Sequence, residues 1–134
     1  MRRIFFVLIA FTVFSYSCKE EQTTSQIEVI SSEEMQEISQ IEGVQLVDVR
    51  TLEEYEEGHI DSFQNIDYFS ENFTQEIEKL DKSKPVIVYC KSGNRSGKCA
   101  KKMKDAGFSK IYDLEGGIAK WKFEGFEVKK KSKP

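Results

Sequence analysis

The run "VIVYC" at residues 86–90 constrains the fold more than any other stretch of this sequence. Its apolar side chains do not alternate with polar ones, which is typical of a strand buried on both faces of a sheet. Pro85 precedes the run, at a strand start, where proline is tolerated. Segments with strand and helix patterns alternate on both sides of it. This order predicts an α/β fold with a mostly parallel central sheet flanked by helices on both faces.

The remaining expected elements follow from periodicity and from helix start signals. Strands are expected at 27–30, 44–49 and 110–115, with a further extended segment at 63–66. Helices are expected at 31–41, from Thr51 to near Gly58, at 70–80, at about 94–106, and around Trp121. Two of these helices open on capping boxes, Ser31 with Glu34 and Thr51 with Glu54. We expect Trp121 and the phenylalanines to lie in the core.

The N-terminus carries an export signal. Arg2 and Arg3 precede "IFFVLIAFTVF", and small residues lead to Cys18. This apolar run of about eleven residues is shorter than the roughly 20 residues that a membrane-spanning helix needs. Residues 1–17 therefore read as a signal peptide that resembles those of bacterial lipoproteins, with Cys18 as the lipidated residue. Simple secretion and a retained anchor are the alternatives.

These features give an expected organisation of the chain. Residues 18–26 would form the lipidated cysteine and a polar tether, 27–128 one domain, and 129–134 a basic tail. The protein would be exported and held by its lipid at a membrane, facing the periplasm or the cell surface. The net charge of −3 becomes more negative without residues 1–17, which hold two arginines and no acid. This balance gives no sign of nucleic-acid binding.

The loop after the central strand is arranged to activate a thiol. Cys90 ends the apolar run, and Gly93 permits the following amides to curl inward. A helix starts where the loop ends, so its free N–H groups point toward the sulfur, and Lys91 and Arg95 add positive charge. These effects favour the thiolate, which is the nucleophile. The other members of the candidate site are Ser92, Asn94 and Ser96.

The length of this loop separates two reaction classes. Phosphatase-like loops place five residues between cysteine and arginine, enough to surround a tetrahedral oxyanion. Here only four residues, 91–94, separate Cys90 from Arg95, and Ser96 follows. The smaller ring of amides suits one terminal sulfur atom better than phosphate. A cysteine phosphatase or arsenate reductase remains the less favoured alternative.

Four motifs in order resemble a single-domain rhodanese, a sulfurtransferase. They are "LVDVR" at 46–50, "EYEEGHI" at 54–60, "YCKSGNRS" at 89–96 and "LEGGIAKW" at 114–121. The resemblance implies a rhodanese-like fold and Cys90 as sulfur acceptor, with residues 91–95 as the active loop. Lys91 stands where the family often has arginine, and "DSFQ" follows "GHI" where a Pro-Gly-Ala-like turn is usual.

The expected activity is transfer of sulfane sulfur through a Cys90 persulfide. A donor such as thiosulfate would load the cysteine, and cyanide or a thiol would take the sulfur. We expect no metal or organic cofactor, and a monomer. A non-catalytic binding or redox module in the cell envelope is the alternative.

Three further residues could shape the pocket. Asp48 and Arg50 end another central strand near the same edge, and Arg50 could pair with Glu53 or Glu54. His59 is the only histidine, but an already ionised thiol needs no general base, so we expect a structural role for it. Cys99 lies on the following helix beside apolar residues and is expected to be a core thiol.

Overall fold

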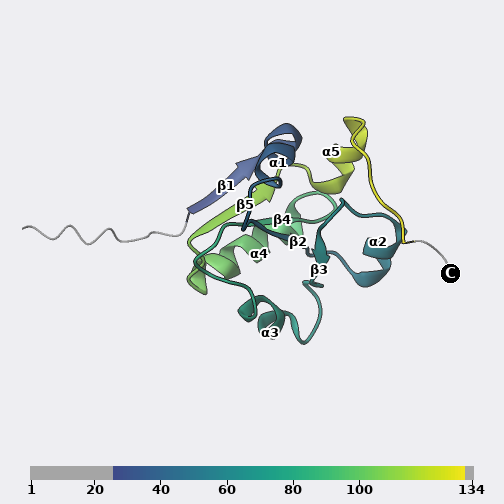
Figure 1. Cartoon of the computed structure of the whole chain (residues 1–134). Helices are drawn as coiled ribbons and strands as arrows, with labels where there is room; N and C mark the ends of the chain where they lie inside the picture. The colour runs from purple at the N-terminus through teal and green to yellow at the C-terminus, as the bar shows by residue number, and fades with distance from the viewer. Residues whose placement is uncertain (1–25, 132–134) are drawn as a thin grey trace, which may run out of the picture.

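The computed structural model describes residues 26–131 and contains one five-stranded parallel sheet (Figure 1). Its strands are β1 (Gln26–Ile30), β2 (Gln45–Asp48), β3 (Gln64–Asn65), β4 (Val86–Tyr89) and β5 (Lys110–Leu114). Their order in the sheet is β1-β5-β4-β2-β3, and every neighbouring pair is parallel. The predicted α/β fold is confirmed, with β4 at the centre.

Five helices connect the strands. They are α1 (Ser32–Ile38), α2 (Leu52–Glu57), α3 (Phe73–Glu78), α4 (Asn94–Asp105) and α5 (Gly117–Phe123). Both predicted capping boxes are present, at the starts of α1 and α2. The first helix stops at Ile38, short of the predicted residue 41, because Ile41 is exposed and does not hold a further turn against the core.

The third helix begins three residues later than predicted. The Phe73 amide donates to the Ser70 carbonyl, and the Asn72 amide donates to the Ser70 hydroxyl. These bonds form a turn before the helix, because a serine side chain competes for backbone donors. The apolar positions are unaffected, since Phe73 and Ile77 are both buried.

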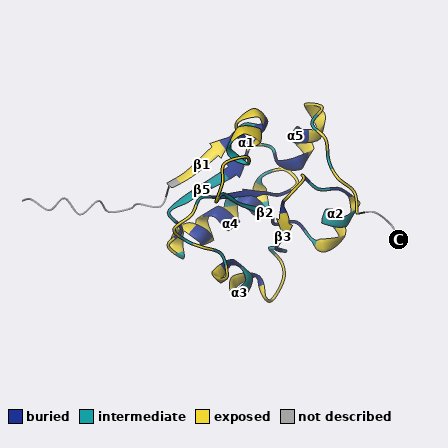
Figure 2. Cartoon of the chain, viewed as in Figure 1, coloured by how far each residue is buried: buried dark blue, intermediate teal, exposed yellow. Residues whose placement is uncertain are grey.

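Buried side chains form one cluster on each face of the sheet. Val86 and Val88 of β4 pack in the cluster covered by α3 and α4. Ile87 and Tyr89 pack in the cluster covered by α1 and α5. All four are fully buried, and β4 lies inside the molecule in Figure 2. The interpretation of this run as a strand with two buried faces is therefore confirmed for residues 86–89, and Cys90 follows the strand.

The carboxyl ends of the central strands meet at one edge of the sheet. Asp48 at the end of β2 is level with Tyr89 at the end of β4. Ligands of open parallel sheets bind beyond this edge, and Cys90 follows β4 there. Cys18 and the signal segment 1–17 lie outside the described residues. Within 26–131 no helix combines the length and apolarity that crossing a bilayer requires.

Candidate active site

The turn from β4 into α4 bends around the sulfur of Cys90. Gly93, the N-cap of α4, has a left-handed φ of 102°, a conformation that glycine adopts without steric cost. Its amide donates a hydrogen bond to Cys90 Sγ over 3.1 Å. The backbone N–H groups of this turn therefore face the sulfur, as the sequence predicted.

This environment lowers the pKa of the thiol. Burial of Cys90 opposes ionisation, but the nearby Ser96 hydroxyl and the backbone N–H groups of Ser96, Gly93 and Ser92 favour the thiolate more strongly, so the pKa lies below its ordinary value. Hydrogen bonds donated to a thiolate stabilise its negative charge and therefore lower the pKa of the thiol. A lowered pKa favours the thiolate, which is the nucleophilic form of cysteine.

The sulfur lies beneath its own loop. Cys90 is only 1% exposed, whereas Lys91, Ser92 and Asn94 are exposed. The amides point inward, but the thiol is covered.

The first turn of α5 forms hydrogen bonds with the backbone of the loop. The Ile118 amide donates to the Cys90 carbonyl over 2.9 Å, and the Ala119 amide donates to the Lys91 carbonyl over 3.0 Å. Gly117 allows this contact, because a Cβ at that position would lie 2.4 Å from the Cys90 carbonyl oxygen. The "GG" motif is thus a site of close backbone approach, a role beyond the turn expected from the sequence.

Arg95 braces the loop against α2. Its guanidinium forms two hydrogen bonds with the Glu54 carboxylate, of 2.7 and 2.9 Å. The hydrogen bond from Arg95 lowers the pKa of Glu54 to about 2. The guanidinium also lies over the ring of Phe69, 5.8 Å from its centroid. In this structure both arms of Arg95 bind Glu54, which the sequence analysis considered as a capping residue and as a partner of Arg50.

Asp48 and Arg50 form a buried ion pair at the neighbouring strand end. Arg50 Nη2 lies 2.7 Å from Asp48 Oδ2, and the same nitrogen donates to the Gly58 carbonyl. The Tyr89 hydroxyl donates to Asp48 Oδ2 over 2.6 Å. The suggested pairing of Arg50 with Glu53 or Glu54 is wrong, because Asp48 binds the guanidinium at short range. The hydrogen bond between Tyr89 and Asp48 connects β4 to β2 beside the loop.

His59 is held within its own segment. Its Nδ1 lies 2.9 Å from the Tyr55 carbonyl oxygen, and its ring stacks on the Tyr55 ring at 3.8 Å. Its backbone forms a bridge with Lys129. These contacts fit a structural role for His59. Among the described residues, the imidazole has no contact with Cys90.

Two more groups lie behind the loop. Cys99 is completely buried in the core, as expected, and both it and Cys90 are free thiols. Asp113, from β5, is 7% exposed, and burial raises its pKa to about 6. The buried Ser96 hydroxyl lies near both Cys90 and Asp113 but has no regular hydrogen-bond partner. Sequence reasoning missed Asp113, whose only signal was an acid between the apolar residues of a predicted strand.

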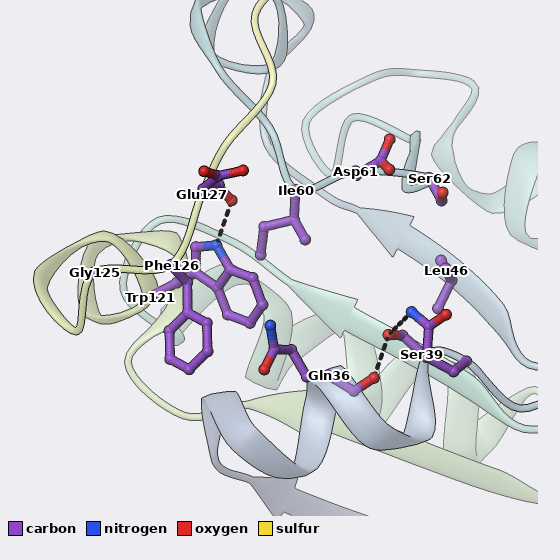
Figure 3. A pocket seen from close by; sticks show the side chains of 11 residues that line it. Gln36, Ser39, Leu46, Ile60, Asp61, Ser62, Trp121, Gly125, Phe126 and Glu127 are labelled. Carbon is purple, nitrogen blue, oxygen red and sulfur yellow. Dashed lines mark hydrogen bonds between the residues drawn. The ribbon is translucent and has the colours of Figure 1, made fainter.

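Two cavities flank this region. One, of about 480 Å³, opens between α1, the segment 60–62 and the end of α5, with Trp121 and Phe126 on one wall (Figure 3). None of its lining residues belongs to the loop 90–96. The other, of about 270 Å³, is called here the α2–α5 cavity and is lined by Arg50, Glu54, Glu57, Gly58, Lys91, Ile118, Ala119 and Lys122. The described residues include no cluster of three or more acidic, His or Cys side chains that could hold a metal ion.

Comparison with known proteins assigns the family. Residues 31–124 match the rhodanese-like domain model, and this chain belongs to that family. A rhodanese-related protein from Thermoplasma volcanium superimposes with a TM-score of 0.68 and 28% identity, covering 78% of this chain and 99% of that one. The expected rhodanese-like fold is therefore confirmed.

Curated relatives point to one kind of activity. Proteins named thiosulfate sulfurtransferase GlpE share 47% identity over 45 residues in Coxiella burnetii and 38% over 65 residues in Pseudomonas fluorescens. These alignments cover 34% and 48% of this chain, and 42% and 58% of the relatives. Another relative is matched over only 16% of its length. The chain thus spans less than two thirds of the length of these curated relatives.

Proposed function

We propose that this protein transfers sulfane sulfur through a persulfide on Cys90. The Cys90 thiolate attacks the outer sulfur of thiosulfate, the sulfur–sulfur bond of thiosulfate breaks, and sulfite leaves with the bonding pair. The product is a Cys90 persulfide anion. Cyanide or a thiol then attacks the outer sulfur of the persulfide, and the Cys90 thiolate is restored. Neither step needs a metal or an organic cofactor.

The inward-facing amide of Gly93 is the observation that carries this proposal. It lies 3.1 Å from Cys90 Sγ, within a loop that has four residues before Arg95. Preorganised N–H donors stabilise negative charge on sulfur without reorganisation at the moment of reaction. The resemblance to proteins named thiosulfate sulfurtransferase supports the same reaction.

The roles of the two loop cations differ in this proposal. Arg95 is engaged by Glu54, so it holds the loop in shape. Lys91 is exposed and forms no ion pair with any described residue. We assign the attraction of the anionic donor to Lys91 and to the loop amides, because an unpaired ammonium on a flexible stem can follow the donor.

Sulfur loading tests the proposal directly. The purified protein is treated with thiosulfate, and its intact mass is measured. We expect a gain of one sulfur atom in the wild type and in Cys99→Ser, and no gain in Cys90→Ser. Release of the added sulfur by cyanide, as thiocyanate, would complete the cycle. A wild-type protein that never gains sulfur contradicts the proposal.

A non-catalytic binding or redox module is the second candidate, because Cys90 is only 1% exposed. It predicts no mass gain from thiosulfate at any concentration, although the folded protein still binds a partner. Hydrolysis of an aryl phosphate that disappears in Cys90→Ser would instead favour a cysteine phosphatase.

We also propose that the protein works outside the cytoplasm, anchored by a lipid on Cys18. The support is the sequence alone, in which an apolar run ends in small residues before Cys18. Labelled fatty acid should enter the protein in cells and should be absent from Cys18→Ala. Equal labelling of both would overturn the anchor.

A further inference from the structure

The α2–α5 cavity is lined by both acidic and basic side chains. Glu54 and Glu57 come from α2. Lys91 comes from the loop and Lys122 from α5. Arg50 also lines the cavity. The cavity therefore offers an acidic and a basic surface to one ligand.

Only some of the charged side chains that line the cavity are free to bind a ligand. Glu54 is bound by Arg95, and the Arg50 guanidinium is bound by Asp48 and by a backbone carbonyl. The remaining charged groups are Glu57, Lys91 and Lys122, and none of them forms an ion pair with another described residue. Two unpaired cations and one unpaired carboxylate thus line the cavity.

The cavity is next to the sulfur-bearing loop. Lys91 directly follows Cys90, and Ile118 and Ala119, which also line the cavity, donate hydrogen bonds to the carbonyls of Cys90 and Lys91. Its volume of about 270 Å³ falls below the roughly 300–1,000 Å³ of pockets for drug-sized ligands. A ligand of amino-acid or short-peptide size suits this space.

We propose that the α2–α5 cavity binds a zwitterionic thiol, either cysteine or a short cysteine peptide, as the sulfur acceptor. Lys122 and Lys91 receive its carboxylate, and Glu57 receives its ammonium group. This inference rests on the proposed persulfide and names the acceptor class for it.

The transfer step needs no further reactant. The bound thiol passes its proton to the Cys90 persulfide anion, and its thiolate then attacks the outer sulfur of the protonated persulfide. The persulfide bond breaks, the Cys90 thiolate leaves, and the acceptor becomes a hydropersulfide. Charge and sulfur are conserved, with one anion before and one after.

Single-turnover kinetics with matched acceptors tests the assignment. Persulfide-loaded protein is mixed with L-cysteine, with cysteamine, which lacks the carboxylate, or with 3-mercaptopropionate, which lacks the ammonium group. Rate constants are expressed per thiolate, because the thiols differ in acidity. We expect cysteine to exceed each analogue about three- to fivefold, the factor that one partly exposed ion pair supplies.

The variants separate the two charge contacts. Lys122→Ala should reduce the rate constant of cysteine to that of cysteamine. Glu57→Gln should reduce it to that of 3-mercaptopropionate. Lys101→Ala on α4 and Glu53→Gln on α2 are exposed controls outside the cavity and should keep the full preference. A preference for cysteine that survives both cavity variants, or equal rates for all three acceptors, overturns the inference.

A binding measurement keeps the two proposals distinguishable. S-methyl-L-cysteine carries both charges but cannot accept sulfur. Its titration into the ¹⁵N-labelled full chain in detergent should shift the amide signals of Glu57, Ala119 and Lys122. Shifts of these amide signals in a protein that gains no sulfur from thiosulfate would refute the proposed persulfide but support the binding site in the α2–α5 cavity. Loading without shifts, and without the cysteine preference, would refute the site alone.

Discussion

Asp113 places a carboxyl group inside the protein without a cation beside it. It forms no ion pair with any described residue, and its Oδ1 has no hydrogen-bond partner among them. Burial raises its pKa to about 6, against about 3.9 in an unfolded chain. Between about pH 4 and pH 6 the unfolded chain ionises this group while the folded protein keeps it protonated. Stability therefore falls as pH rises through this window.

Asp113→Asn should remove this pH dependence. We expect the variant to be more stable than the wild type at pH 8, by about 1–3 kcal/mol, because a shift of about two pKa units corresponds to nearly 3 kcal/mol at most. At pH 4 the gain should vanish. Urea unfolding at both pH values measures it, with exposed Asp105→Asn as control. An equal change at both pH values would refute this account.

At the scale of elements, two contacts hold the active loop in place. Arg95 at the start of α4 binds Glu54 on α2, and both side chains are less than one third exposed. On the other side, the first turn of α5 meets the backbone of Cys90 and Lys91. The loop is therefore fixed from two helices that are far apart in sequence, which is the preorganisation that an anionic sulfur requires.

Loss of the Glu54 charge should loosen the first contact. Glu54→Gln keeps a capping side chain at the start of α2 but loses the ion pair. We expect a loss of about 1–2 kcal/mol at pH 7, after allowance for solvent screening. Because Arg95 depresses the pKa of Glu54 to about 2, this stabilisation is present above about pH 4.5 and disappears as pH falls toward 2.

A double-mutant cycle isolates the pair. Glu54→Gln, Arg95→Gln and the double variant are unfolded in urea at pH 7 and at pH 3. The coupling free energy should be clearly positive at pH 7 and smaller at pH 3. If the two substitutions change the free energy of unfolding additively at pH 7, Glu54 and Arg95 do not stabilise each other.

The contact with α5 depends on Gly117. Gly117→Ala should cost about 3 kcal/mol or more, since the new Cβ would lie 2.4 Å from the Cys90 carbonyl oxygen. Gly125→Ala is the matched control, because its φ is also positive, at 88°, but no atom lies within 4 Å of the added Cβ. It should cost about 1 kcal/mol. Similar losses, measured by urea unfolding, would contradict a specific role of the close contact.

At the scale of the molecule, the sheet and the position of the loop could be predicted from the sequence, because both follow from periodicity. The apolar run at 86–90 fixes β4, and the carboxyl edge follows from parallel pairing. The partners of charged side chains could not be predicted. Arg50 binds Asp48 and Arg95 binds Glu54, and these choices depend on side-chain directions that spacing alone does not contain.

The burial of Cys99 makes it a reporter of global unfolding. Burial raises the pKa of this thiol to about 12, and the side chain is fully enclosed by the core. In a Cys90→Ser, Cys18→Ser background, iodoacetamide at pH 8 should leave the native protein unlabelled. Labelling should increase only along the urea transition followed by Trp121 fluorescence. Rapid labelling without urea would mean that α4 opens locally.

The parallel direction of β1 separates the start of the described chain from the reactive thiol. The strand β1 begins at Gln26 (Figure 1), and it runs parallel to β5 and β4 toward the edge of the sheet where Cys90 follows β4. The start of β1 and the reactive thiol therefore lie at opposite ends of the strands, about 15 Å or more apart. If Cys18 is the anchor that we propose, its tether joins the domain at the end of the strands opposite Cys90. With the membrane at that end, the edge that bears Cys90 would stay open to soluble metabolites.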